Sequence, residues 1–224
     1  MVRTGPAMSG ELYRMLDEFG SEYGEKRIFA AAYQLLTDDE KQRLSDMLLT
    51  ACTQPFPDAM PAADRARYLY EALRRNIVYY PEPPFPREAY TFLGALKGRA
   101  VCLGVSELFH LCLLAGGIAN EIVIGSIDGK TDSLHAWNRV TLEDGSSYFC
   151  DLTWDLTVSD SPPRYFLKGT DAFSAAGHMF RADQYPGVSA RDYPATPRPD
   201  SKTLALYTEL WKTYFFQTDR KVVT

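Results

Sequence analysis

The sequence has no basic run and no long apolar run, and each absence excludes a class of protein. Its 24 Lys and Arg residues face 29 Asp and Glu residues, and the formal net charge is −5. This balance argues against a nucleic-acid surface, which needs a basic patch. No apolar stretch reaches the ~18 residues needed to cross a bilayer. We therefore expect neither nucleic-acid partners nor membrane insertion.

Cysteine is also scarce, and the four that occur lie far apart: Cys52, Cys102, Cys112 and Cys150. None forms a CxxC pair, which argues against a zinc site, and four are too few for a disulfide scaffold in 224 residues. The first residues lack the apolar segment of a signal peptide. We expect a cytoplasmic protein by default, and secretion stays open if an export signal has been trimmed.

What is present is typical of a globular protein, with 46% hydrophobic and 24% charged residues. Apolar residues with helical spacing predict helices in the first half. They cover residues 11–19, 25–36, 37–51 (opened by a Thr37–Glu40 capping box), 61–77 and 102–114, with one or two further helical turns over 90–96. Gly116 and Gly117 are expected to close the helix that starts at Cys102.

The second half reads mainly as strands, predicted over residues 120–127, 136–142 and 147–152, with 164–167 as a candidate fourth. An Asp144-Gly145 turn joins the second and third strands. A proline-rich loop spans 81–86, residues 171–193 are loop-rich, and a closing helix covers 204–216. Helices followed by strands predict an α+β fold.

Cys102 stands at the predicted start of a helix. Unpaired N–H groups and the helix dipole favour a thiolate there, so we expect the pKa of this cysteine to fall. The same N–H groups could hold an oxyanion, and the small neighbours Ala100 and Gly104 would leave room for a substrate. Taken alone, a buried core cysteine is the commoner interpretation.

His135 and Asp151 lie at similar distances on either side of the Asp144-Gly145 turn, so they are expected to be opposite or diagonal in a hairpin. The carboxylate could then orient the imidazole toward a thiol. Asp155 is a competing orienter. Of the other two histidines, His110 is interpreted as structural; His178 could approach the site, but a solvated loop residue is the better interpretation.

Three segments in this order resemble the transglutaminase-like superfamily of papain-like fold. They are Ala100-Val101-Cys102, His135-Ala136-Trp137 and Asp151-Leu152-Thr153-Trp154-Asp155. The resemblance covers roughly residues 90–155, and it departs from the family at Ala100, where glycine is usual. It implies Cys102 as nucleophile, His135 as general base and Asp151 as orienter. The implied core is a nucleophile helix packed on an antiparallel sheet, and the three segments of the chain are residues 1–60 (helical extension), 61–193 (catalytic core) and 194–224 (linker and helix).

The resemblance implies an amide-bond hydrolase, protease-like or amidase-like, or an acyltransferase that works through a thioester. No metal or organic cofactor is needed for this chemistry, and the expected partner is a peptide or protein amide. Candidate groove walls are Tyr79, Tyr80, Tyr90 and Trp137, for which core packing is an equally good interpretation. The alternative function is a peptide- or protein-binding module that keeps the fold without catalysis. The sequence does not indicate the oligomeric state.

Overall fold

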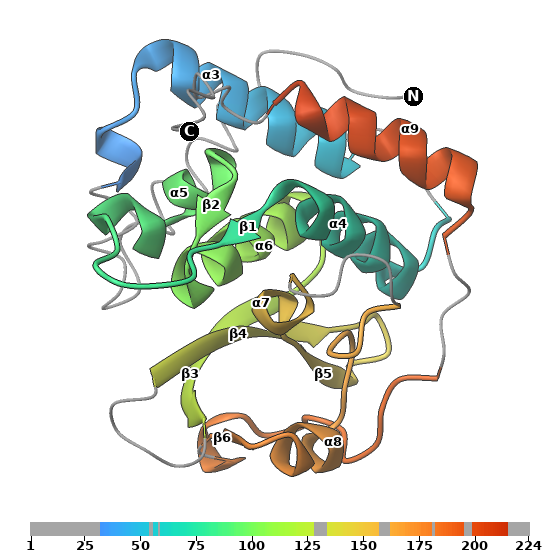
Figure 1. Ribbon diagram of the computed structural model, residues 1–224. Coiled ribbons are helices and arrows are strands. Elements are labelled where there is room, and N and C mark those ends of the chain that lie inside the picture. The colour runs from blue at the N-terminus through green and yellow to red at the C-terminus, as the bar shows by residue number, and fades with distance from the viewer. Residues whose placement is uncertain are drawn as a thin grey trace.

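The computed structural model of the protein (Figure 1) describes residues 32–53, 56–57, 59–127, 134–156, 162–180, 182–194 and 199–214. The helices expected over 11–19 and most of 25–36 lie outside these residues. Longer helices are α3 (Asp38–Asp46), α4 (Ala62–Asn76), α6 (Cys102–Ala115) and α9 (Ser201–Lys212). Shorter ones are the π-helical η1 (Met47–Ala51), the 3-10 turns η2 (Arg87–Tyr90) and η3 (Ala182–Gln184), and α5 (Phe92–Leu96), α7 (Leu152–Asp155) and α8 (Thr170–Ala175).

The strands form two sheets. A parallel pair joins β1 (Val78–Tyr79) to β2 (Arg99–Ala100). A four-stranded antiparallel sheet has the order β5-β4-β3-β6, from β3 (Asn120–Ile127), β4 (Leu134–Thr141), β5 (Ser147–Cys150) and β6 (His178–Met179). This mixture of helices and an antiparallel sheet confirms the predicted α+β class.

The predicted helix signals are confirmed where the structure describes them. Thr37 and Glu40 form the expected capping box, which satisfies backbone donors at the start of α3. The helix after Pro61 is α4. The helix from Cys102 ends at Ala115, and Gly117 then adopts a φ of 71°, a conformation that glycine accepts without steric cost.

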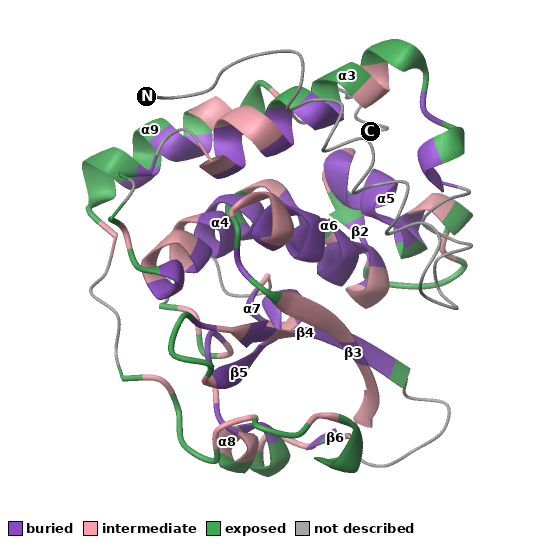
Figure 2. Cartoon of the chain, turned by 180° about the vertical axis from the view of Figure 1, so that it is seen from behind, coloured by how far each residue is buried: buried purple, intermediate pink, exposed green. Residues whose placement is uncertain are grey.

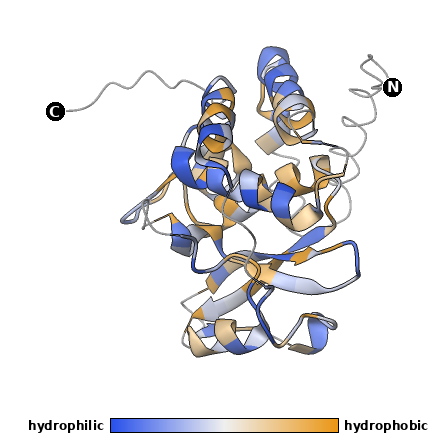
Figure 3. Ribbon diagram, turned by 90° about the vertical axis from the view of Figure 1, so that its right-hand side faces the viewer, coloured by the Kyte–Doolittle hydropathy of each residue, from blue (hydrophilic) through white to orange (hydrophobic). Residues whose placement is uncertain are grey.

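Helix α6 occupies the middle of the molecule. Its residues 104–113 are all buried, as expected for a mainly apolar helix, and they include the polar residues Ser106, Glu107 and His110. It packs against α4 and α5 on one side and against β3 and β4 on the other, and Figure 2 shows it enclosed between these layers. In Figure 3, apolar residues gather between the helices and the sheet, and hydrophilic residues cover the outer helices.

Two corrections concern the strands. The strand predicted over 147–152 ends at Cys150, because Asp151 caps the short helix α7 with its own side chain. The strand predicted over 164–167 does not form: this segment is bent, and the Asp155 carboxylate accepts hydrogen bonds from the backbone N–H groups of Arg164 and Tyr165. Both changes come from local side-chain-to-backbone hydrogen bonds that compete with a sheet ladder.

The closing helix predicted over 204–216 is α9, which begins at Ser201 and ends at Lys212; residues 215–216 lie outside the described residues. Helix α9 packs on α4 and η1, and the domain boundaries at residues 60 and 193 stay a prediction. Within the part of the chain that the structure describes, no helix is both long enough and apolar enough to cross a membrane.

Candidate active site

Cys102 is the first residue of α6 and is half-buried. The preceding residue, Val101, is extended and donates its N–H to the carbonyl of Ala89 (2.9 Å). No side chain caps this end of α6 among the described residues. The first N–H groups of a helix have no intrahelical acceptor, so the sulfur of Cys102 stands beside backbone donors that a ligand could use.

The small residues around Cys102 serve chain packing, which corrects the prediction that they leave room for a substrate. Ala100 is fully buried. A Cβ at Gly104 would lie 2.5 Å from the carbonyl oxygen of Thr91 and 2.6 Å from that of Ala89. Glycine is therefore needed for the first turn of α6 to approach the 89–91 backbone.

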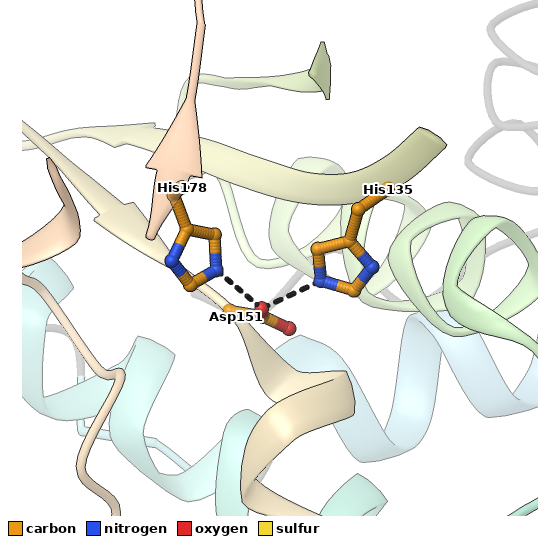
Figure 4. A group of neighbouring side chains, drawn as sticks. All are labelled: His135, Asp151 and His178. Atoms are coloured by element: carbon orange, nitrogen blue, oxygen red, sulfur yellow. Dashed lines mark hydrogen bonds and ion pairs between the residues drawn. The ribbon is translucent and has the colours of Figure 1, made fainter. Parts of the chain in front are cut away.

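Asp151 holds His135 in a buried hydrogen bond. The Nε2 atom of His135 lies 2.7 Å from Oδ2 of Asp151, and Asp151 has no exposed surface. The second oxygen, Oδ1, accepts from the backbone N–H of Trp154 at 3.1 Å. Because Asn138 pairs with Cys150 in the sheet, the continued register puts His135 diagonal to Asp151, as the spacing around the turn predicts (Figure 4).

Cys102 completes the group through a side-chain hydrogen bond with His135. Nε2 of His135 is used by Asp151, so Nδ1 is the ring nitrogen left for the thiol. The structure therefore brings together the three residues for which the sequence predicts nucleophile, base and orienter. They come from three elements: the start of α6, the start of β4 and the turn between β5 and α7.

The electrostatics of this group favour an ionised pair. Burial raises the pKa of Asp151, but hydrogen bonds from His135 and His178 outweigh it and hold this pKa below its ordinary value. Burial lowers the pKa of His135, but hydrogen bonds with Asp151 and Cys102 and the negative charges of both raise it to about 10. His135 is thus an imidazolium near neutral pH, facing a carboxylate on one side and the sulfur on the other.

His178 is the residue that the sequence interpretation missed. It was expected to be a solvated loop histidine, but it lies on β6, is 1% exposed, and places Nε2 2.8 Å from the same Oδ2 of Asp151 (Figure 4). The local signal was weak: β6 has two residues, and only the apolar neighbours Met179 and Phe180 hinted at burial.

Asp155, the competing orienter, has a structural position. Its Oδ2 lies 2.6 Å from the hydroxyl of Tyr70, and its two oxygens accept from the N–H groups of Arg164 (2.8 Å) and Tyr165 (2.9 Å). The hydroxyl of Tyr70 also lies 2.8 Å from the carbonyl oxygen of Asp151. These contacts tie α7 to α4 and fix the backbone that carries Asp151.

Three of the four candidate groove walls, Trp137, Tyr80 and Tyr90, have different surroundings. Trp137 is wrong as a groove wall: it is 0% exposed and packs in a cluster with Val123, Phe149 and Phe173. Its ring crosses the strand at Gly125, where a Cβ would lie 2.3 Å from Trp137 Cη2.

Tyr80 and Tyr90 are accessible instead. Tyr90 is 41% exposed and Tyr80 is half-buried. Phe85, from the proline-rich loop, packs between them, with ring centroids 6.2 Å from Tyr80 and 6.0 Å from Tyr90. The aromatic group of Tyr80, Phe85 and Tyr90 is connected to the backbone just before Cys102. The N–H of Tyr80 donates to the carbonyl of Ala100 (3.2 Å), next to the pairing of β1 with β2.

The other thiols and the remaining histidine are buried away from this group. Cys52 and Cys112 are fully buried and hydrogen-bond with each other, and Cys150 accepts from the N–H of Leu167 at 3.2 Å. His110 pairs with Asn120 at 2.8 Å. All four cysteines are free thiols, and Cys102 alone has accessible surface and a histidine partner.

His135, Asp151 and His178 also form a set of side chains that could hold a metal ion. The Asp151 oxygen lies 2.7 and 2.8 Å from the two Nε2 atoms, which are hydrogen-bond lengths. Tetrahedral ligands at zinc bond lengths would stand roughly 3.3 Å apart. The distances between the Asp151 oxygen and the two Nε2 atoms therefore fit hydrogen bonds better than shared coordination of a metal ion.

The raised pKa of His135 predicts a pH-dependent stability. Its folded-state value of about 10 lies above the ordinary value of 6.5. The stabilisation is thus complete below pH 6.5 and is lost as pH rises toward 10. We expect the difference in unfolding free energy between the wild type and His135→Gln, measured by urea denaturation, to shrink between pH 6.5 and 10.

His110→Gln is the matched control for this prediction. Burial lowers the pKa of His110 to about 4, so its contribution changes only below pH 6.5. The difference in unfolding free energy between the wild type and His110→Gln should stay constant between pH 6.5 and 10. A constant difference for His135→Gln as well would contradict the ionised pair.

Comparison with known proteins finds a family similarity over the part of the chain that carries these residues. Residues 50–152 match the sequence model of the transglutaminase-like superfamily. A search of curated proteins finds no match. Among solved structures, the chain is similar to a suspected cysteine protease from Cytophaga hutchinsonii, with 14% identity over 69% of this chain and 51% of that chain and a TM-score of 0.41.

Two further structures show a similar level of likeness. One is a TGase (14% identity, 89% of this chain, 56% of that chain, TM-score 0.42). The other is EGTA-treated LapG of Legionella pneumophila (13% identity, 86% of this chain, 98% of that chain, TM-score 0.34). The chain spans about half the length of the Cytophaga structure. Residues 50–152, which contain Cys102, His135 and Asp151, are similar to the core of the transglutaminase-like superfamily.

Proposed function

We propose that this protein is a cysteine-dependent enzyme that cleaves or exchanges amide bonds through a thioester on Cys102. The observation that carries the proposal is the continuous hydrogen-bonded line from Cys102 through His135 to the buried Asp151. A thiol beside an imidazole that a third group orients is the arrangement of an activated nucleophile. The superfamily match supports the same chemistry.

The first half of the reaction follows from these positions. The sulfur of Cys102 attacks the carbonyl carbon of the amide, and the carbonyl oxygen becomes an oxyanion. Backbone N–H groups in the first turn of α6 are the donors available to it. His135 gives its proton to the leaving amine as the C–N bond breaks, which leaves a thioester.

The second half uses the same base in reverse. His135, now neutral, takes a proton from water or from an amine that attacks the thioester. The sulfur leaves as thiolate, and the imidazolium–thiolate pair is restored. Water gives hydrolysis, and an amine gives acyl transfer. Asp151 stays ionised throughout, because the donors around it favour its charged form.

A peptide or protein amide is the proposed substrate. Tyr80, Phe85 and Tyr90 form an accessible aromatic group, and its backbone is joined to the residues just before Cys102. Aromatic rings with accessible faces suit peptide side chains. A module that binds peptides without turnover would use the same surface, and an experiment separates the two.

The test is incubation with a library of peptide amides, with and without an added primary amine, followed by mass spectrometry. We expect free acids without the amine, an amine-exchanged product with it, and neither product from Cys102→Ser. Product formation that survives in Cys102→Ser would contradict the proposal. Peptide binding without either product in the wild type would favour the binding module.

A further inference from the structure

We propose that His178 is a positioning residue, which holds the Asp151 carboxylate in the orientation that sets the ring of His135. His178 hydrogen-bonds with Asp151 and acts on His135 through this carboxylate. The inference rests on the proposed function, since the base that it positions is the one that serves Cys102. The observation behind it is one carboxylate oxygen shared by two histidines.

The hydrogen bonds around Asp151 show what His178 adds. Oδ2 accepts from both Nε2 atoms, at 2.7 Å from His135 and 2.8 Å from His178, and Oδ1 accepts from the N–H of Trp154 at 3.1 Å. Asp151 has no exposed surface, so water cannot replace a lost donor easily. Without His178, Oδ2 would keep only His135 as a hydrogen-bond partner among the described residues, and the carboxylate could turn together with that ring.

The ring of His178 is itself held on several sides. Its centroid lies 4.2 Å from the ring of Trp154 and 4.3 Å from that of Phe173, and the ring of Trp137 meets it edge-on at 5.2 Å. These contacts fix the direction of Nε2. They differ from the contacts of a solvated histidine, whose ring would turn freely.

The second nitrogen of His178 indicates which tautomer is present. Nδ1 is buried and has no hydrogen-bond partner among the described residues. A proton on Nδ1 would leave an N–H buried without an acceptor, which is costly. A proton on Nε2 is instead donated to Asp151. Of the two tautomers, the one with its proton on Nε2 is therefore the one that this environment favours.

The topology makes His178 a link between distant parts of the chain. It follows α8 and pairs with Ile127 at the edge of the sheet, and it is 27 residues from Asp151 in sequence. The α8–β6 segment thus closes the side of the site opposite to α6. Through His178, the position of Asp151 depends on the packing of that segment.

The test compares His178→Gln with His178→Met. The two side chains have similar length, but only glutamine has an N–H donor that can reach Asp151. We expect kcat for peptide amides to fall roughly ten- to hundred-fold in His178→Met, the range for partners that orient an active group. KM should stay unchanged, and His178→Gln should recover most of kcat.

Nitrogen-15 NMR of the labelled histidine rings shows which ring nitrogen carries the proton. A variant that only loses packing would not change this signal at His135. In the wild type we expect His178 to carry its proton on Nε2, and we expect the Nε2–H signal of His135 to shift in His178→Met but not in His178→Gln. Equal kcat and equal His135 signals in the two variants would overturn the proposal. A wild-type His178 that carries its proton on Nδ1 would also overturn it. This measurement uses the wild type alone, so it does not depend on whether a variant folds.

This result is separable from that of the proposed function. If the wild type turns over no peptide amide, the proposed function fails, but the His135 signal still reports whether His178 orients the Asp151–His135 pair. If turnover occurs and His178→Met matches the wild type in kcat, the positioning role fails and the proposed function stands.

Discussion

Replacing Asp151 with asparagine is expected to lower kcat for peptide amides by about three to four orders of magnitude, as loss of the orienting carboxylate does in comparable triads. The carboxylate accepts from His135, His178 and the Trp154 N–H, using both oxygens. An amide has one acceptor oxygen, so at least one of these donors would face an NH₂ group. The measurement is steady-state kinetics on the best peptide amide.

Stability should fall as well, and most strongly in Asp151→Leu. That change removes every acceptor from donors that have no access to water. Breaking a buried ionic pair on one side costs about 3–5 kcal/mol, which urea denaturation would show as a lower midpoint.

Asp144→Asn is the control for both Asp151 variants. Asp144 is exposed, in the turn between β4 and β5, and its side chain accepts hydrogen bonds from the backbone N–H and the hydroxyl of Ser146. We expect its stability within about 0.5 kcal/mol of wild type, with unchanged kcat. If Asp151→Asn matched this control in kcat, Asp151 would not be the orienter.

The elements that could be predicted are those encoded locally. The helix that starts at Cys102 has apolar residues at helical spacing and Gly116-Gly117 at its end, and the hairpin around Gly145 has a two-residue turn signal. The diagonal placement of His135 and Asp151 follows from counting residues around that turn. Each of these depends on residues close together in the sequence.

The elements that could not be predicted depend on contacts between distant segments. His178 meets Asp151 because a two-residue strand joins the far edge of the sheet, and nothing near it in sequence encodes that pairing. Trp137 is buried because α8 supplies Phe173 on the same face. Gly104 packs on the 89–91 backbone, a long-range approach that composition alone does not reveal.

Cys102 is expected to be alkylated by iodoacetamide at least tenfold faster than any of the other three cysteines at pH 7. Two causes act together. Cys52, Cys112 and Cys150 have no exposed surface, whereas Cys102 is half-buried. Burial also raises the pKa of Cys112 and Cys150, which disfavours their reactive thiolates.

Accessibility alone would give part of this difference, so the effect of His135 decides the interpretation. His135 is the side chain that hydrogen-bonds with Cys102, and a base beside a thiol activates it as a nucleophile. In His135→Ala the rate at Cys102 should fall at least tenfold at pH 7, although its sulfur becomes no less accessible. His110→Ala, at the buried histidine away from the site, should leave the rate unchanged.

Peptide mapping of iodoacetamide-treated wild type and His135→Ala, with rates resolved for each cysteine at pH 7, tests most directly whether an imidazole activates this sulfur. Fast labelling confined to Cys102 in the wild type, and slow labelling of the same residue without the imidazole, is the predicted result. Equal Cys102 rates in the two proteins, or equal rates at all four thiols, would contradict it.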